Sequence, residues 1–157
     1  MILSKNEILK EVSIKPFSKG NLGDASYDLT LDDVFWFFKP KDIKLKEESD
    51  FNKYTIKKRM KEITLLPGEF VLGRTKERIK LPEDVCGFLS GRSRFARFGL
   101  SVHSTAMLIN PGSNNRQVFE IKNNSNNPLT LKPGLKIGQL IFVRGGKGKY
   151  RGRFSKQ

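Results

Sequence analysis

The sequence has few of the residues on which metal- and disulfide-dependent proteins rest. It contains one cysteine, Cys86, and one histidine, His103, among 157 residues. One cysteine excludes an internal disulfide and suits a reducing compartment. One Cys and one His also exclude most metal sites built from soft ligands. No apolar run approaches the roughly 18 residues of a membrane span, and the N-terminus lacks the features of a signal peptide. We therefore expect a cytoplasmic protein without membrane contact.

Acidic residues are scarce in the second half of the chain. Residues 86–157 hold 13 basic side chains and one acid, Glu120, whereas residues 1–85 hold 17 basic and 15 acidic ones. The net charge of +14 indicates either an anionic partner or an ordinary solvated basic surface. Glu120 lies in the apolar run 118–121, where strand alternation would put Phe119 and Ile121 on the opposite face.

The apolar pattern predicts an all-β fold with a short N-terminal helix. Ser4 and Glu7 have capping-box spacing. Ten short apolar runs follow, separated by turn signals such as Pro67-Gly68 and Pro133-Gly134, which is typical of a β-sandwich or barrel. We expect a single domain over residues 1–157, with 39–61 as a charged surface excursion or hairpin and the glycine-rich residues 145–157 as a mobile arm.

Two segments carry candidate chemistry. Residues 91–97, GRSRFAR, combine three arginines with Ser93, and guanidinium groups match phosphate oxygens in pairs. Alone, this is also the composition of an ordinary basic turn. Residues 101–106, SVHSTA, precede a turn at Asn110-Pro111-Gly112 that leads toward Glu120. A lone histidine such as His103 is more often structural than catalytic.

Taken in order, these segments resemble the dCTP deaminase and dUTPase superfamily, on the deaminase side. The resemblance rests on GRSRFARFGLSVHSTAMLINPG, QVFEIKN and LKPGLKIGQLIF. Residues 25–29, ASYDL, are similar to an early family element, and residues 149–152, KYRG, are similar to its C-terminal arm. The resemblance implies a distorted, dUTPase-like β-barrel or jelly roll that forms a homotrimer with sites shared between chains. It also implies a deoxypyrimidine triphosphate substrate that carries Mg²⁺ on its phosphates.

The matched positions imply roles for individual residues. Glu120 would be the general base and Arg97 would hold it. The substrate-binding residues implied are Arg92, Ser93, Arg94, His103, Thr105, Ala106, Asn110, Gln139 and Tyr150. Deamination needs an activated water and a group that moves its protons to the ring and the leaving amine, which one glutamate can do. The zinc route requires H-x-E and P-C-x-x-C motifs, and Ser104-Thr105 follow His103 here. We therefore expect no zinc and no metal ligands from side chains.

The match breaks at three positions near the implied site. Asn110 stands where the family has Asp; an amide cannot accept a proton from water, which argues against hydrolysis of the phosphate chain. Arg94 replaces a serine, and Met107 replaces a glycine. The arm also ends soon after Phe154-Ser155.

Three functions stay open. The first is dCTP deamination to dUTP and ammonia. The second is dUTP diphosphatase activity, alone or coupled to deamination. The third is a non-catalytic homologue that binds nucleotide or nucleic acid. We do not expect nucleic acid as the partner, because no aromatic-rich stacking motif accompanies the basic residues.

Overall fold

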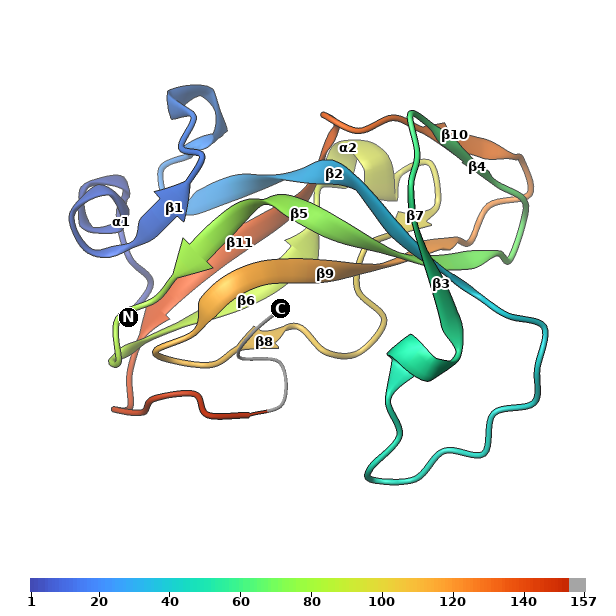
Figure 1. Ribbon diagram of the computed structural model, residues 1–157. Coiled ribbons are helices and arrows are strands. Elements are labelled where there is room, and N and C mark those ends of the chain that lie inside the picture. The colour runs from blue at the N-terminus through green and yellow to red at the C-terminus, as the bar shows by residue number, and fades with distance from the viewer. Residues whose placement is uncertain (153–157) are drawn as a thin grey trace.

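In the computed structural model, which describes residues 1–152, the chain forms a curled sheet of nine strands (Figure 1). The strand order is β7-β9-β5-β2-β11-β6-β8, with β1 paired to β5 and β3 to β2, and every pairing is antiparallel. Strands β4 and β10 form a separate ribbon. The strands are β1 (Ser13–Lys15), β2 (Ser26–Phe38), β3 (Thr55–Arg59), β4 (Ile63–Leu65), β5 (Phe70–Lys80), β6 (Val85–Gly91), β7 (Leu100–Ser101), β8 (Leu108–Ile109), β9 (Asn114–Asn123), β10 (Leu129–Leu131) and β11 (Lys136–Arg144).

Four short helical segments complete the fold: α1 (Lys5–Glu11), η1 (Lys19–Asn21), η2 (Phe51–Lys53) and α2 (Ser93–Ala96). The Glu7 carboxylate accepts hydrogen bonds from the Ser4 hydroxyl at 2.6 Å and the Ser4 amide at 2.8 Å, which fixes the start of α1. These bonds lower the pKa of Glu7. The prediction of a mainly β fold with a short N-terminal helix is confirmed.

The concave side of the sheet holds the hydrophobic core. Strand alternation sends Phe119 and Ile121 of β9 into this core, where both are fully buried, as the sequence predicts. The ring of Phe119 packs over Gly138 of β11, and a Cβ atom there would collide with it. The core therefore fixes which residues of β9 face outward, and Glu120 is one of them.

A second, smaller apolar cluster lies on the outer side of the same sheet. Val34 and Trp36 of β2 pack with Leu72 of β5, and Phe51 and Val118 lean against them. The rings of Trp36 and Phe51 meet edge to face, with centroids 6.1 Å apart. This cluster gives the outer face of the sheet a hydrophobic floor beside Glu120.

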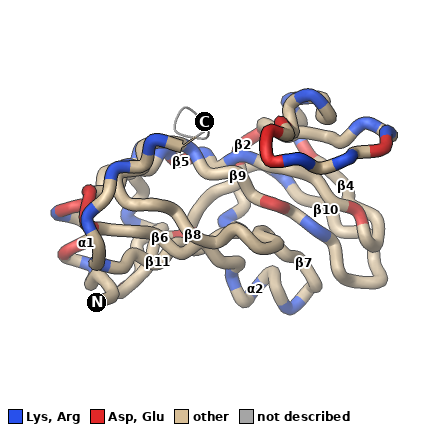
Figure 2. Tube along the Cα trace, turned by 90° about the horizontal axis from the view of Figure 1, so that it is seen from below, with Lys and Arg blue, Asp and Glu red and all other residues tan. Residues whose placement is uncertain are grey.

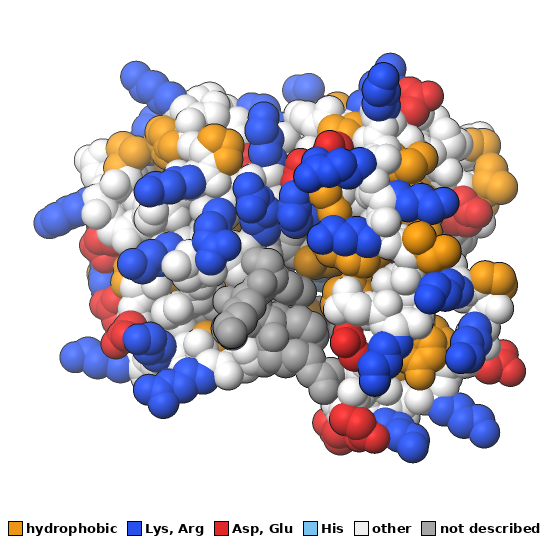
Figure 3. Space-filling view, in the orientation of Figure 1, with side chains coloured by type: hydrophobic (Ala, Val, Ile, Leu, Met, Phe, Trp, Pro, Cys, Tyr) orange, Lys and Arg blue, Asp and Glu red, His pale blue; other side chains and the backbone are white. Residues whose placement is uncertain are grey.

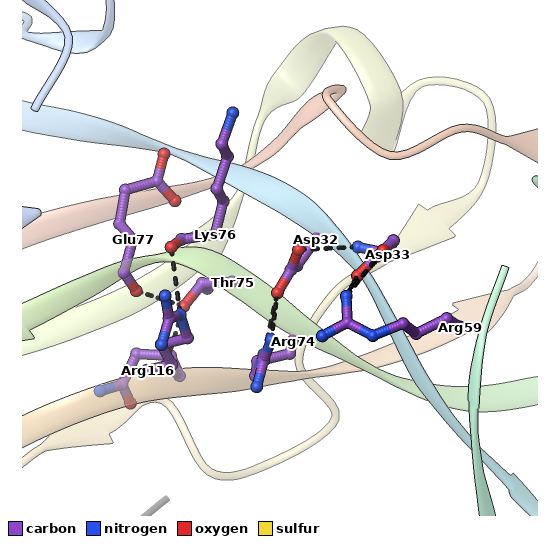
Figure 4. Close-up of polar contacts among 9 residues, drawn as sticks. Asp32, Asp33, Arg59, Arg74, Thr75, Lys76, Glu77 and Arg116 are labelled. Atoms are coloured by element: carbon purple, nitrogen blue, oxygen red, sulfur yellow. Dashed lines mark hydrogen bonds and ion pairs between the residues drawn. The ribbon is translucent and has the colours of Figure 1, made fainter. Parts of the chain in front are cut away.

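The pairing of β5 with its two neighbours, β2 and β9, is irregular in the middle of the sheet. The β2–β5 register shifts between Leu31 and Phe35, and the β5–β9 register shifts between Arg74 and Arg78. Asp32 accepts bonds of 2.9 and 2.6 Å from Arg74 across this irregularity (Figure 4). The sequence predicts two separate runs here, 27–31 and 34–38, but the structure continues them as one strand because the bulge absorbs the polar residues between them.

Five short elements were not predicted from the sequence. Strand β1, helix α2 and the segments η1 and η2 are too short to show a period, and β3 lies inside the charged segment 39–61, which was interpreted as a surface excursion or hairpin. After Thr55 every residue of β3 is exposed, and three of these four are basic. The Lys57 ammonium lies 5.2 Å from the centre of the Trp36 ring. An exposed edge strand can carry such residues, because its backbone pairing with β2 does not depend on them.

The described part of the C-terminal arm follows the body of the protein. The amide of Gly148 donates to the Glu83 carbonyl at 2.7 Å, and that of Tyr150 donates to the Pro111 carbonyl at 3.0 Å. The predicted mobile arm, 145–157, extends over residues 153–157, which lie outside the described residues. Within residues 1–152, no helix is long and apolar enough to cross a membrane.

Candidate active site

Glu120 lies on the outer face of β9, opposite Leu72 of β5. Its Oε2 atom accepts a hydrogen bond of 2.5 Å from the amide of Ser104 and one of 3.3 Å from the amide of Thr105. The Glu120 amide in turn donates to the Val102 carbonyl at 2.9 Å. The loop that follows β7 is therefore hydrogen-bonded to Glu120 twice over, through the carboxylate and through the backbone amide. Among the described residues, no donor reaches Oε1 of Glu120.

A cavity of about 370 Å³ opens beside this carboxylate. This volume falls in the range of small-molecule sites, roughly 300–1,000 Å³. The residues that line it come from β2, η2, β5, the loop before β8, β8 and the turn after it, β9 and the C-terminal segment. The apolar ones are Phe38, Phe51, Phe70, Leu72, Ala106, Leu108, Ile109 and Val118, and the polar ones are Asn110, Ser113, Asn115, Gln117, Glu120 and Tyr150. Four residues identified from the sequence therefore meet here: Ala106, Asn110, Glu120 and Tyr150.

The polar end of the cavity contains residues that the sequence did not single out. The Ser113 hydroxyl donates to the Asn110 carbonyl at 2.6 Å, and the Gln117 Nε2 atom donates to Asn115 Oδ1 at 2.6 Å. Asn115 is 5% exposed. Amides are common turn and surface residues, so only their clustering in three dimensions marks them. Together they offer hydrogen bonds to a polar ligand at the end away from Phe70.

Arg92, Ser93 and Gln139 line a different cavity, of about 360 Å³. Its other lining residues are Gly20, Asn21, Leu22, Gly23, Ser26 and Asp28, and it shares none with the first cavity. The Arg92 Nη2 atom lies 3.0 Å from Asp28 Oδ2, and Nη1 donates to the Lys136 carbonyl at 2.9 Å. Gln139 donates to the Ser26 hydroxyl at 3.0 Å. One chain therefore keeps the implied base and the implied phosphate ligands apart.

Neither Arg94 nor Arg97 lines either cavity. Arg94 lies on α2 and Arg97 follows it, and both residues are exposed. Figure 2 shows basic residues along the trace of α2. We predicted from the sequence that Arg97 pairs with Glu120. Within residues 1–152 of one chain that ion pair is absent, and the backbone amides of Ser104 and Thr105 take its place. The pairing of Arg97 with Glu120 therefore stays a prediction for an assembly in which sites are shared between chains.

His103 and Thr105 flank the carboxylate without lining the cavity. Thr105 contributes only its amide to Glu120. The Nδ1 atom of His103 is buried and has no hydrogen-bond partner among the residues described. His103 therefore belongs to the loop that holds Glu120, and it does not line the cavity in this chain.

The fold resembles that of solved enzymes of pyrimidine nucleotides. The 2'-deoxycytidine 5'-triphosphate deaminase from Agrobacterium tumefaciens superposes with a TM-score of 0.73 at 16% identity, covering 92% of this chain and 49% of that one. This chain thus spans about half the length of that protein. A dUTPase from phage phi11 of S. aureus gives a TM-score of 0.56 at 15% identity, covering 90% of this chain and 95% of that one. The barrel is thus of the dUTPase-like type, as predicted.

The sequence comparisons identify the family. A family model described as dCTP deaminase-like matches residues 2–145. A protein from Mycolicibacterium vanbaalenii, named dCTP deaminase, dUMP-forming, is 37% identical over 153 residues, which cover 92% of this chain and 80% of the relative. A protein of the same name from Clavibacter michiganensis subsp. michiganensis is 36% identical over 174 residues, covering 100% and 87%. The chain belongs to the dCTP deaminase-like family and is an enzyme of that superfamily.

Proposed function

We propose that the protein deaminates dCTP, with Glu120 as the general base. The observation that carries this proposal is the position of Glu120: two backbone amides fix one carboxylate oxygen, and the residue lines a cavity of about 370 Å³. Fixing one oxygen orients the other toward a water molecule without neutralising the charge that makes it a base. No other carboxylate lines this cavity among the described residues.

The proposed reaction balances with one water. Glu120 accepts a proton as the water oxygen bonds to C4 of the cytosine ring and passes it to N3, which gives a tetrahedral intermediate with a C4 hydroxyl. The carboxylate then takes the proton of that hydroxyl and passes it to the exocyclic amine, so the C4–N bond breaks and ammonia leaves as the C4 carbonyl forms. The products are dUTP and ammonia, and no step needs zinc. We propose that the reaction takes place in the cytoplasm.

We further propose that the working site is shared between copies in a homotrimer. The Arg92 cavity and the Glu120 cavity have no residue in common, so the triphosphate ligands of one copy would complete the Glu120 cavity of the next. Apolar side chains near both cavities support a covered surface: Phe98 is 65% exposed, Leu108 52% and Met107 41%. In this arrangement Arg97 of a neighbouring copy would approach Glu120. A molar mass by light scattering equal to that of one chain at micromolar concentration would contradict the trimer.

Mg²⁺ would enter with the substrate. The described residues contain no group of three or more His, Cys, Asp or Glu side chains that could hold a metal ion, and Asp28 is already paired with Arg92. The protein therefore offers only the guanidinium of Arg92 and the hydroxyl of Ser93 to the phosphates. An ion that bridges phosphate oxygens would neutralise part of their charge there.

A second candidate, formation of dUMP, is favoured by the name of the relatives, dCTP deaminase, dUMP-forming. Asn110 opposes it, since this residue lines the cavity where a water-activating carboxylate would be needed. We therefore propose that dUTP is the main product. The deciding experiment is a time course with dCTP and Mg²⁺ that resolves dCTP, dUTP, dUMP and pyrophosphate. Pyrophosphate released with ammonia from the start would favour the second candidate, and no turnover at all would leave a nucleotide-binding homologue.

A further inference from the structure

Cations from three neighbouring strands gather on one face of the sheet. The register places Lys15 of β1 opposite Arg78 of β5, and Arg78 opposite Arg116 of β9. Two residues further along β5, Ser13, Lys80 and Asn114 form a second row across the same strands. Lys76, Arg78 and Lys80 alternate with buried residues, so they share this face. Figure 3 shows Lys and Arg side chains gathered over this part of the molecule. We call Lys15, Lys76, Arg78, Lys80 and Arg116 the basic face.

The basic face differs from the other cationic regions because no described carboxylate lies within ion-pair distance of it, although the charge of Arg116 acts on Asp32 from further away. At the neighbouring irregularity, Arg74 pairs with Asp32 at 2.6 Å and Arg59 pairs with Asp33 at 2.6 Å (Figure 4). No residue of the basic face forms an ion pair with any described residue. Like charges directly opposite each other destabilise a sheet, so this arrangement favours an external anion.

The two arginines of the basic face are held by neutral groups. Arg78 donates from Nε to Asn114 Oδ1 at 3.0 Å and from Nη2 to the Asn114 carbonyl at 2.7 Å. Arg116 donates from Nε to the Lys76 carbonyl at 3.2 Å. Each guanidinium is thus ordered but keeps its charge and further N–H donors. Ordering side chains before binding reduces the entropy lost on binding.

A depression of about 220 Å³ lies within the basic face, lined by Ser13, Lys15, Arg78, Lys80 and Asn114. Arg, Lys, Ser and Asn side chains are those that contact phosphate oxygens in nucleic-acid complexes. No aromatic side chain lines the depression, so it offers no platform on which unpaired bases could stack. The depression therefore suits the phosphate groups of a duplex better than a single strand, whose unpaired bases would need a stacking platform.

The dimensions of the basic face fit two phosphate rows. From Lys76 to Lys80 is about 13 Å at roughly 3.3 Å per residue, and from β1 to β9 is about 10 Å at two strand spacings. The minor groove of B-form DNA is about 6 Å wide, so one face of this size reaches phosphates on both strands. The minor groove of duplex RNA is wide and shallow and fits less well.

We propose that the basic face is a docking site for the backbone of double-stranded DNA, without sequence preference. Binding would place the enzyme on DNA while leaving the Glu120 cavity open to nucleotides. This departs from the expectation drawn from the sequence, which considered only base stacking. It does not depend on the proposed function, because the two sites use different residues.

The test is fluorescence anisotropy of a labelled duplex of about 20 bp, titrated with the full chain at several salt concentrations. Five cations predict that log K falls against log salt with a slope of about −4.5, near 0.9 per neutralised phosphate. The variant Lys15→Gln/Lys76→Gln/Lys80→Gln removes three exposed ammonium groups and leaves both arginines in place. It should weaken binding at least about tenfold and bring the slope to about −2.

The matched control is Lys39→Gln/Lys41→Gln/Lys44→Gln, which removes the same charge from the exposed excursion. It should change binding less than about twofold, and the Lys→Arg triple at 15, 76 and 80 should bind like wild type. Equal losses in the two Gln triples would overturn the proposal, because net charge alone would then explain binding. Stronger binding of a single strand, of duplex RNA or of anionic lipid vesicles than of duplex DNA would also overturn it. The first Gln triple should turn over dCTP normally, so failure of the proposed reaction is seen separately.

Discussion

The amide of Ser104 donates a hydrogen bond of 2.5 Å to Oε2 of Glu120. The bond joins the loop after β7 to the middle of β9, and the Glu120 amide returns a bond to the Val102 carbonyl. The carboxylate is therefore positioned by backbone rather than by a long, flexible side chain. Its orientation depends on the fold of one chain, even where its counter-charge would come from another.

Glu120→Gln should abolish most turnover without unfolding the protein. The glutamine Oε1 atom can still accept the amide of Ser104, so the loop keeps its place, but the amide cannot take a proton from water. We expect kcat to fall by about a hundredfold or more, with a melting temperature near that of wild type and dCTP binding retained. The control is Glu69→Gln, since Glu69 also accepts a backbone amide, that of Leu66 at 2.7 Å, outside the cavity. Wild-type turnover by folded Glu120→Gln would end the case for this base.

Arg92→Ala should weaken substrate binding more than it slows the chemical step. Losing a charge-assisted contact to phosphate costs about 1.5–3 kcal/mol, which corresponds to a rise in KM of roughly ten- to a hundredfold. The variant also leaves Asp28 without its cation, so Arg92→Lys, which keeps the charge, separates stability from binding. Arg59→Ala removes an exposed arginine paired with Asp33 and serves as the control. An unchanged KM in Arg92→Ala would disprove the phosphate assignment.

Asn110→Asp should raise hydrolysis of dUTP. The side chain lines the same cavity as Glu120, and a carboxylate there could activate a water against the phosphate chain. We expect dUMP to form from dUTP faster than in wild type, by at least about tenfold, while deamination continues. Pyrophosphate release with dUTP as the only nucleotide is the measurement. Brisk dUTP hydrolysis by wild type would show instead that another group positions the water.

The Asp32–Arg74 pair should make stability depend on pH in acid. Burial would raise the pKa of Asp32, but the hydrogen bonds from Arg74 and the Asp33 amide, with the nearby arginine charges, outweigh it and lower the pKa below the ordinary value of 3.8. The folded state thus binds this proton less readily than the unfolded state. The pair's contribution is complete above about pH 5 and is lost as the pH falls through the lowered pKa.

Asp32→Asn should reduce the free energy of unfolding by about 1–2 kcal/mol at pH 7 and by much less near pH 2–3. Urea denaturation at both pH values measures the difference. In the matched variant Asp33→Asn, the lost partner is the exposed Arg59, and such surface pairs contribute about 0–1 kcal/mol. Equal pH dependence in Asp32→Asn and wild type would contradict this assignment.

The outward position of Glu120 could be predicted because it follows from strand alternation. Phe119 and Ile121 had to enter the core, and the charged residue between them had to leave it. The same rule failed in β2, where Asp32 and Asp33 interrupt the pattern at a bulge. The arginines that pair with these aspartates, Arg74 and Arg59, lie far along the chain, so the local sequence does not indicate that the strand continues.

The polar end of the cavity could not be predicted for a related reason. Asn115 and Gln117 have the opposite alternation on β9 from Glu120, yet all three line one cavity, beside the point where the β5–β9 register shifts. The predicted contact between Arg97 and Glu120 is a different case. The motif that contains Arg97 is clear, but the contact needs a second copy, which one chain does not supply. Local sequence patterns thus predict a strand and its two faces, whereas register shifts and the assembly of chains determine which side chains come together.

The separation of Arg92 and Glu120 into two cavities has a genetic consequence. In the proposed trimer, each working site takes its base from one copy and its phosphate ligands from the next, so two different inactive subunits could repair each other. Mixing unfolded Glu120→Gln and Arg92→Ala chains in equal amounts and refolding them together should restore about a quarter of wild-type activity, because random assembly joins two intact halves at about one contact in four. Alleles with these lesions would then complement each other in one cell, while either allele alone would turn over dCTP far more slowly at low substrate concentration.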